Sequence, residues 1–145
     1  MLDRKPKMDK PLVTIGITCF NAQDSISRAI STATNQDWGN CEVIIVDDCS
    51  KDASVECINS AIKNEPNIRL FCHEKNSGPA GARNTLLSEA NVEFLVFFDD
   101  DDESSINRVS EQYATITNYE KSTGGKLIAC YASGTRHYPN GYSKD

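Results

Sequence analysis

The chain has 145 residues, of which 39% are hydrophobic and 25% charged, so its composition is that of one soluble globular domain and excludes a disordered chain. No apolar run approaches the roughly 20 residues that cross a bilayer, and we interpret the apolar stretch at 12–20 as a buried strand rather than a signal peptide. The net charge is −6, and seven of the 21 acidic residues lie in two clusters, at 47–48 and 99–103. This local acidity indicates a site, and no basic stripe suits nucleic acid.

Short apolar runs alternate with amphipathic runs along most of the chain. In order, the pattern predicts a strand at 12–18, a helix at 25–34, a strand at 42–46, a helix at 53–63, a strand at 68–72, a helix at 79–90, a strand at 93–98, a helix at 105–120 and a strand at 126–131. We expect Asp52 to cap the second helix, and Ser104 or Ser105 to cap the fourth. This order predicts an α/β fold, a doubly wound and mostly parallel sheet with helices on both faces.

The two ends of the chain depart from this pattern. Residues 1–10 are charged and predict a flexible segment before a domain at 11–145. Residues 138–142 predict a strand that enters an Asn-Gly turn, and the chain stops four residues after that turn. We expect a hairpin whose return strand is missing, and therefore a domain truncated at its C-terminus. The exposed sheet edge also favours a homodimer.

The chain has six cysteines, and none of them forms a C-x-x-C pair. This spacing fits neither a zinc ribbon nor a thioredoxin-like motif. We expect all six to be reduced and structural, which together with the absence of a signal peptide predicts a cytoplasmic location.

Acidic residues follow the second and fourth predicted strands. In a doubly wound sheet the ligand lies beyond the carboxyl ends of the strands, where Thr18, the pair Asp47 and Asp48, and the run at 99–102 converge. Four adjacent carboxylates repel one another, so we expect a divalent cation there, with capping of the next helix as the alternative. The pair at 47–48 suits an acceptor for a ligand N–H or hydroxyl, with a helix cap again as the alternative.

Residues 76–84 form a glycine-containing loop that opens a helix, a position that favours anions. The loop is neither G-x-G-x-x-G nor a Walker sequence. Arg83 suits a phosphate or the acidic residues, and a structural salt bridge is the alternative. His73 and His137 have no ligand spacing and are expected to be structural or exposed, and no serine has the context of a nucleophilic triad.

Four segments together resemble the nucleotide-sugar-binding half of the family 2 glycosyltransferases, which have the GT-A fold: residues 13–21, 42–52, 76–84 and 97–102. The resemblance implies that Thr18 and Asp48 hold the uracil and ribose of a UDP-sugar. It also implies that Asp99 and Asp101 are the outer acids of a D-x-D motif, and that Mn²⁺ or Mg²⁺ binds at Asp101 or Asp102. The full set of expected donor-binding residues is Thr18, Phe20, Asn21, Asp47, Asp48, Arg83, Asp99, Asp100 and Asp101.

The sequence departs from the family in two places. Cys49 stands where glycine or asparagine is usual, and because a positive φ there would be strained for cysteine, we expect this loop to differ slightly from the family. The segments that carry the general base and bind the acceptor follow the fifth strand in the family. We therefore name no catalytic residue and expect the base beyond Asp145.

The resemblance implies an inverting, metal-dependent transferase that moves a sugar from UDP to a hydroxyl of a saccharide or lipid-linked saccharide. Surface polysaccharide synthesis, in the cytoplasm or at the inner face of the membrane, is the expected setting. One alternative is a non-catalytic nucleotide-sugar-binding module. Another is a magnesium-dependent phosphoryl-transfer domain of the receiver or haloacid dehalogenase type, which also uses aspartates at strand ends.

Overall fold

The structure is a computed structural model that describes residues 10–90, 92–126, 129–132, 136–137 and 143–144. The described residues fall into two compact units, one within residues 1–106 and the other within residues 107–145. Almost all of the predicted flexible segment at 1–10 lies outside the described residues.

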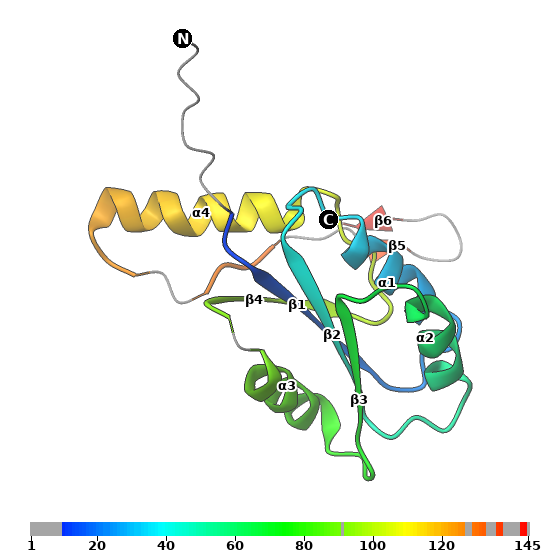
Figure 1. The fold of residues 1–145 in the computed structure, drawn as a ribbon. Coiled ribbons are helices and arrows are strands. Elements are labelled where there is room, and N and C mark those ends of the chain that lie inside the picture. The colour runs from blue at the N-terminus through cyan, green and yellow to red at the C-terminus, as the bar shows by residue number, and fades with distance from the viewer. Residues whose placement is uncertain (1–9, 91, 127–128, 133–135, 138–142, 145) are drawn as a thin grey trace. The chain divides into compact units, whose positions relative to one another are not determined.

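A parallel sheet forms the centre of the first unit (Figure 1). Among the described residues it has four strands in the order β3-β2-β1-β4, with β1 at Val13–Cys19, β2 at Cys41–Asp47, β3 at Ile68–Cys72 and β4 at Phe94–Asp99. The first four predicted strands are therefore confirmed, since no end of any of them differs from the prediction by more than one residue.

The register of the strands brings the carboxyl ends of β1, β2 and β4 together. Thr18 of β1 lies opposite Val46 of β2 on one side and opposite Asp99 of β4 on the other. Since parallel strands end at the same edge of a sheet, the chain segments that follow these strands emerge side by side. The expected convergence of the three sequence motifs is thus a consequence of the strand order.

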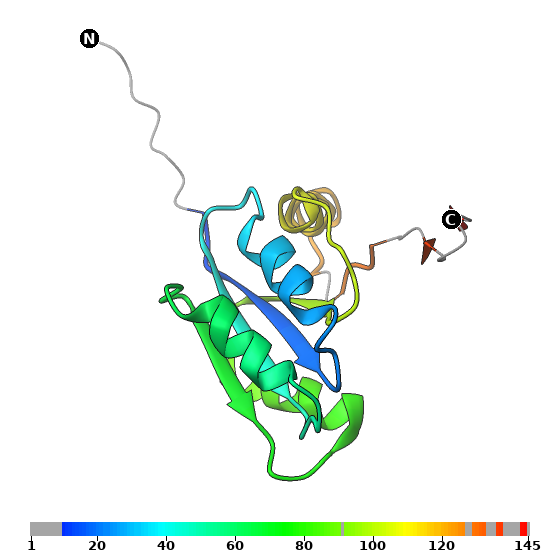
Figure 2. The same ribbon diagram turned by 90° about the vertical axis from the view of Figure 1, so that its right-hand side faces the viewer.

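Helices cover both faces of the sheet, as predicted (Figure 2). Helix α1, Ile26–Thr34, packs on β1, β2 and β4 and against α2, Ser54–Ile62, while α3, Gly78–Glu89, packs on β1 and β2 from the other face. Alternate residues of a strand face opposite sides of the sheet. Because helices cover both sides, β1 and β2 are buried almost throughout.

Gly16 allows α3 to approach β1 closely. A Cβ atom at this position would lie 2.9 Å from Leu86 Cδ1. Leu86 and Ala82 of α3 are fully buried and form a core cluster with Ile44 and Val46 of β2. The packing fixes the position of α3, and with it the position of its N-terminus at the carboxyl edge of the sheet.

The capping residue of α2 differs from the prediction. The N-cap is Ala53, and Asp52 stands one residue earlier. The Asp52 carboxylate accepts hydrogen bonds from the N–H of Ser54 at 3.0 Å and from the N–H of Gln23 at 3.1 Å. Asp52 thus ties the start of α2 to the loop before α1, which places it outside the helix.

The fourth helix, α4 at Arg108–Thr123, begins and ends three residues later than expected, and its N-cap is Asn107 instead of Ser104 or Ser105. The carbonyl of Ser105 accepts a hydrogen bond from Gln36 Nε2 at 2.8 Å, and the carbonyl of Ile106 accepts one from the Asp37 N–H at 2.9 Å. These carbonyls face the segment after α1 and not the helix, so the helix begins after them.

The fifth strand predicted at 126–131 is wrong in the part that the structure describes. Lys126 and residues 129–131 lie outside any strand, and residues 127–128 are outside the described set. The C-terminal hairpin is confirmed by the antiparallel pairing of β5, Arg136–His137, with β6, Ser143–Lys144. The return strand is therefore present as β6, contrary to the prediction, while the turn at 138–142 lies outside the described residues. Within the described chain, no helix combines the length and the apolar character needed to cross a bilayer.

Candidate functional site

A pocket of about 430 Å³ lies at the carboxyl edge of the sheet. Its walls come from the segments that follow β1, β2, β3 and β4 and from the first turns of α3. The lining residues are Thr18, Cys19, Phe20, Asp48, Asn76, Gly78, Pro79, Ala82, Arg83, Asp99, Asp100 and Asp101.

Most of the residues predicted from the sequence to bind a donor line this pocket, but Asn21 and Asp47 do not. Asn21 has a φ of 51° and supports the neighbouring loop, because its Oδ1 accepts a hydrogen bond from the Lys51 N–H at 2.8 Å. Asp47 is only 2% exposed; its Oδ2 accepts the Ser50 N–H at 3.0 Å, and its buried Oδ1 has no hydrogen-bond partner among the described residues. Both residues shape the loop behind the pocket.

Cys49 has a φ of 66°, so the loop keeps the left-handed conformation at this position although the residue is a cysteine, contrary to the expectation that the loop would differ. A side chain in this region costs energy that glycine would not. The Cys49 Sγ lies 3.1 Å from Lys51 Nζ and 3.5 Å from the carbonyl oxygen of Glu74. All six cysteines, each in the described part of the chain, are free thiols.

Asp48 is the most heavily hydrogen-bonded side chain of the pocket. Its Oδ1 accepts the N–H of Ser77 at 2.8 Å and the hydroxyl of Ser77 at 2.9 Å, and lies 2.7 Å from Nδ1 of His73. Its Oδ2 accepts the N–H of Gly78 at 2.7 Å. Burial by itself would raise the pKa of Asp48, but these hydrogen bonds outweigh burial and hold the pKa below its usual range.

This geometry changes the expected role of the start of α3. Ser77 is the N-cap of α3 and Gly78 is its first residue, and the N–H groups of both bind Asp48. A carboxylate at this place also complements the helix dipole. Asp48 therefore caps a helix that begins 30 residues further along the chain, and these two N–H groups already have an anionic partner.

The acidic segment after β4 is attached to the segment after β1. The carboxylate of Asp100 accepts a hydrogen bond from the Phe20 N–H at 2.9 Å. Burial, followed by the negative charges of Asp101 and Asp99, raises the pKa of Asp100. A bound cation would relieve this repulsion.

Two arginines neutralise part of this acidic segment. Arg83 Nη2 lies 3.4 Å from Asp99 Oδ1, and its guanidinium stands 5.8 Å from the ring centroid of Phe97. Arg28 Nε lies 3.0 Å from Glu103 Oε1, and Arg28 Nη2 donates to the carbonyl oxygen of Asp101 at 3.3 Å. Arg83 lines the pocket, so it can form the ion pair with Asp99 and can also bind an anion in the pocket.

The residues at 99–102 fit a hard divalent cation through the chemistry of their oxygens. Asp101 and Asp102 are exposed, and the described residues contain no group of three or more His, Cys, Asp or Glu side chains arranged around one point. Magnesium is commonly held by one or two carboxylates, with water and substrate phosphates completing the shell. The arrangement therefore fits an ion that binds together with a phosphate.

Several residues of the site were missed by the sequence analysis. Asn76 lines the pocket and donates from Nδ2 to the carbonyl oxygen of Asp48 at 3.1 Å, and His73 contacts the Asp48 carboxylate from behind the pocket. Cys19 lines the pocket as well, and burial followed by the charges of Asp100 and Asp47 raises its pKa to about 12. Only the position of Asn76 at the start of a glycine-containing loop gave a sequence signal for any of them.

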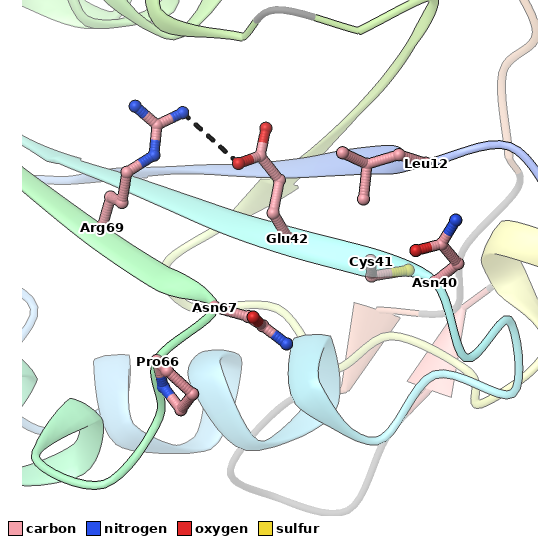
Figure 3. Close-up of a pocket in the computed structure, with 7 residues that line it drawn as sticks. All are labelled: Leu12, Asn40, Cys41, Glu42, Pro66, Asn67 and Arg69. Carbon is pink, nitrogen blue, oxygen red and sulfur yellow. Dashed lines mark hydrogen bonds and ion pairs between the residues drawn. The ribbon is translucent and has the colours of Figure 1, made fainter.

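A second pocket, of about 260 Å³, lies at the opposite edge of the sheet, where Cys41 begins β2 and Pro66 and Asn67 precede β3 (Figure 3). Its charged groups bind one another, since Arg69 Nη2 lies 3.3 Å from Glu42 Oε2. The Glu42 carboxylate also accepts a hydrogen bond from the Thr14 hydroxyl at 2.6 Å. This pocket brings no comparable cluster of acids to a helix end, so the pocket at the carboxyl edge of the sheet is the better candidate.

The sequence from residue 14 to residue 142 matches glycosyl transferase family 2. The chain belongs to this family. The structure agrees, because the solved structures that it resembles are glycosyltransferases with the GT-A fold. One of them is TarS of S. aureus, crystallised with UDP and also with UDP-GlcNAc. The likeness to it has a TM-score of 0.67 and 28% identity, over 74% of this chain and 32% of the TarS chain.

Two curated members of glycosyl transferase family 2 illustrate the relationship. An uncharacterised glycosyltransferase of Haemophilus influenzae is 32% identical over 130 residues, covering 89% of this chain and 52% of the relative. The Escherichia coli protein WfgD is named as a UDP-Glc:alpha-D-GlcNAc-diphosphoundecaprenol beta-1,3-glucosyltransferase. It is 36% identical over 139 residues, covering 84% of this chain and 53% of WfgD. The chain thus spans about half the length of these family members.

Proposed function

We propose that the protein transfers a sugar from a UDP-sugar, with inversion and with the help of Mn²⁺ or Mg²⁺, to a hydroxyl of a saccharide or lipid-linked saccharide. We place this reaction in the synthesis of surface polysaccharides, in the cytoplasm or at the inner face of the membrane. The observation that carries the proposal is that Asp48, Arg83 and the acids at 99–101 all line one pocket.

The nucleobase is the part of the donor that Asp48 suits. A carboxylate has about four acceptor sites, and Oδ2 of Asp48 uses one of its sites on the Gly78 N–H. The remaining site on Oδ2 can accept the N3–H of uracil, and Thr18 and Phe20 line the same pocket. The relative TarS binds UDP in a crystal, and the name of WfgD gives UDP-Glc as its donor, which supports a uridine nucleotide here.

The diphosphate is the part that the charged wall suits. Asp101 and Asp102 would hold the metal ion, and Arg83 would contribute a guanidinium on the same side. When bound, the ion stabilises the negative charge that develops on departing UDP. The role of Arg83 is then to leave Asp99 and bind a phosphate oxygen, which the exposure of both side chains permits.

The acceptor hydroxyl needs a general base, and we place that base beyond Asp145. The acids that line the pocket are all assigned to donor and metal in this proposal.

Calorimetry with UDP tests this proposal. We expect UDP to bind weakly in EDTA and more tightly with Mn²⁺ or Mg²⁺, whereas uridine, which lacks phosphates, should bind equally in both. Equal UDP affinity in the two buffers would contradict the metal role. No UDP binding in either would contradict the choice of donor.

A further inference from the structure

We propose that His73 is a positioning residue that sets the nucleobase selectivity of the pocket by holding the Asp48 carboxylate through an Nδ1–H donor. The inference rests on the proposed binding of a uridine nucleotide. His73 does not line the pocket, so it acts through Asp48.

The backbone and the ring of His73 are both fixed. His73 directly follows β3, and its N–H donates to the carbonyl oxygen of Asp47 at 2.8 Å. The ring has three partners: Nδ1 lies 2.7 Å from Asp48 Oδ1 and 2.9 Å from Ser77 Oγ, and Nε2 lies 2.8 Å from Thr85 Oγ1 of α3. The side chain is 19% exposed, and that of Asp48 is 5% exposed, so water competes little for this contact.

The chemistry of the partners decides which ring nitrogen carries hydrogen. An ionised carboxylate is an acceptor only, and the hydrogen bonds on Asp48 hold its pKa below the usual range. Nδ1 of His73 must therefore be the donor in their 2.7 Å contact. In a neutral imidazole the other nitrogen, Nε2, is then an acceptor.

Thr85 supports this arrangement whichever charge the ring has. Its hydroxyl lies 2.8 Å from Nε2 of His73 and 3.3 Å from the carbonyl oxygen of Gly81. The hydroxyl can donate to a neutral ring, or donate to Gly81 and accept from a protonated ring. Rotation of one hydroxyl thus preserves the Nδ1–H donor to Asp48 in both states.

The consequence is a fixed orientation of the Asp48 carboxylate. Oδ1 is fully used by the Ser77 N–H, the Ser77 hydroxyl and His73, so only Oδ2 retains acceptor capacity. An acceptor that cannot donate attracts the N3–H of uracil and repels the N3 lone pair of cytosine. His73 keeps Asp48 in this state, which favours UDP over CDP.

The test measures UDP and CDP affinities of the wild type and variants by calorimetry. We expect His73→Leu to lower the UDP-over-CDP preference by about tenfold, the scale of one lost buried polar contact. His73→Asn should restore most of the preference, because an Asn Nδ2–H can donate where His Nδ1–H does. A purely structural role would weaken both nucleotides equally and would not distinguish Asn from other replacements.

Thr85→Val gives a second test that leaves His73 in place. We expect a smaller loss of the same preference, because Nε2 of His73 loses its partner. Thr34→Val is the matched control, since Thr34 makes the same hydroxyl bond to the carbonyl four residues earlier, Ile30 O, without a histidine. The preference should be unchanged in this control.

Two outcomes overturn the inference alone: an unchanged UDP-over-CDP preference in folded His73→Leu, or a ¹⁵N spectrum of the ligand-free wild type in which Nδ1 of His73 carries no hydrogen. If His73→Leu does not fold, the other two variants decide. The inference is contradicted if the UDP-over-CDP preference is lost in His73→Asn but retained in Thr85→Val. A wild type that binds neither nucleotide overturns the proposed function and the selectivity together, and the ¹⁵N spectrum then still reports whether the histidine assignment was correct.

Discussion

Asp48 serves the fold and the pocket with the same carboxylate. It caps α3 through the N–H groups of Ser77 and Gly78, and it lines the pocket beside Thr18. Its neighbour Asp47 is equally buried but faces the loop, where its Oδ2 binds the Ser50 N–H. Two adjacent and identical residues therefore differ in their contacts because the start of α3 reaches the carboxylate of Asp48 and not that of Asp47.

Replacing Asp48 by Asn is expected to affect stability and binding together. The loss of a buried, hydrogen-bonded carboxylate should lower the free energy of unfolding and the affinities for UDP and uridine by about 1–3 kcal/mol each. Urea denaturation and calorimetry measure these quantities. The exposed Asp102→Asn is the control, which should keep stability and uridine affinity but lose the metal-dependent gain for UDP. Equal loss of uridine affinity in both variants would contradict the proposal that Asp48 binds the nucleobase and Asp102 binds the metal ion.

The stability that Asp48 contributes should depend on pH in a defined direction. Because its folded-state pKa lies below its unfolded value, the ionised form favours folding. The contribution is complete above the unfolded pKa of about 3.9 and is lost as the pH falls through the folded pKa. The stability difference between the wild type and Asp48→Asn should therefore narrow as the pH falls below about 4.

Asp52, whose pKa is also lowered, titrates in the same direction. It is present in both proteins of this comparison, so the difference isolates Asp48. Urea denaturation at a series of pH values gives the curve. A difference that widens in acid would mean that Asp48 is not held ionised by the α3 end.

At the level of the elements, the start of α3 requires a residue without a side chain at Gly81. A Cβ atom on Gly81 would lie 2.5 Å from Ser77 Cβ, and it would also contact the Ser77 hydroxyl that binds Asp48. Glycine at this position therefore leaves room for the Ser77 side chain to donate its hydrogen bond to Asp48.

Gly81→Ala is expected to destabilise the protein and weaken UDP binding, although alanine normally stabilises a helix interior by about 1 kcal/mol relative to glycine. The added methyl group displaces Ser77 and with it the cap from Asp48. On a Ser77→Gly background the clashing atoms are absent, so the same substitution should be neutral or stabilising. Thermal unfolding of the four proteins gives this double-mutant cycle, and a destabilisation that is equal on both backgrounds would contradict the steric explanation.

At the level of the whole molecule, the described residues supply the pocket that we propose for the donor nucleotide, and the chain spans about half the length of its relatives. With the general base placed beyond Asp145, a protein of residues 1–145 should bind UDP and metal yet transfer sugar negligibly. A positioned base is typically worth about 10²–10⁴-fold in rate.

An acceptor-dependent assay of UDP release, with and without the following segment of the protein, measures this prediction. Addition of that segment should restore turnover while leaving the UDP affinity nearly unchanged. Robust turnover by residues 1–145 alone would place a base within them, and His137 would be the first residue to replace.

Much of the fold could be predicted from the sequence because its signals are local. Runs such as Val43 to Val46 are continuous and β-branched, and Ile26, Ala29, Ile30 and Ala33 repeat at helical spacing, so the strands and helices of the first unit were found. The start of α4 was harder to predict, since the carbonyls of Ser105 and Ile106 are bound by Gln36 and Asp37, which lie 69 residues earlier in the chain.

The sequence by itself determined the alternation of strands and helices, and the acids that follow β2 and β4, because these depend on side-chain periodicity and residue type. Only the tertiary structure decided what each acid does. Asp48 and Asp47 are indistinguishable in sequence, and their roles follow from the packing of α3 on β1 and β2, which brings Ser77 and Gly78 to one carboxylate and not to the other. His73 gained its role in the same way, since a contact between residues 25 apart depends on strand order rather than on local pattern.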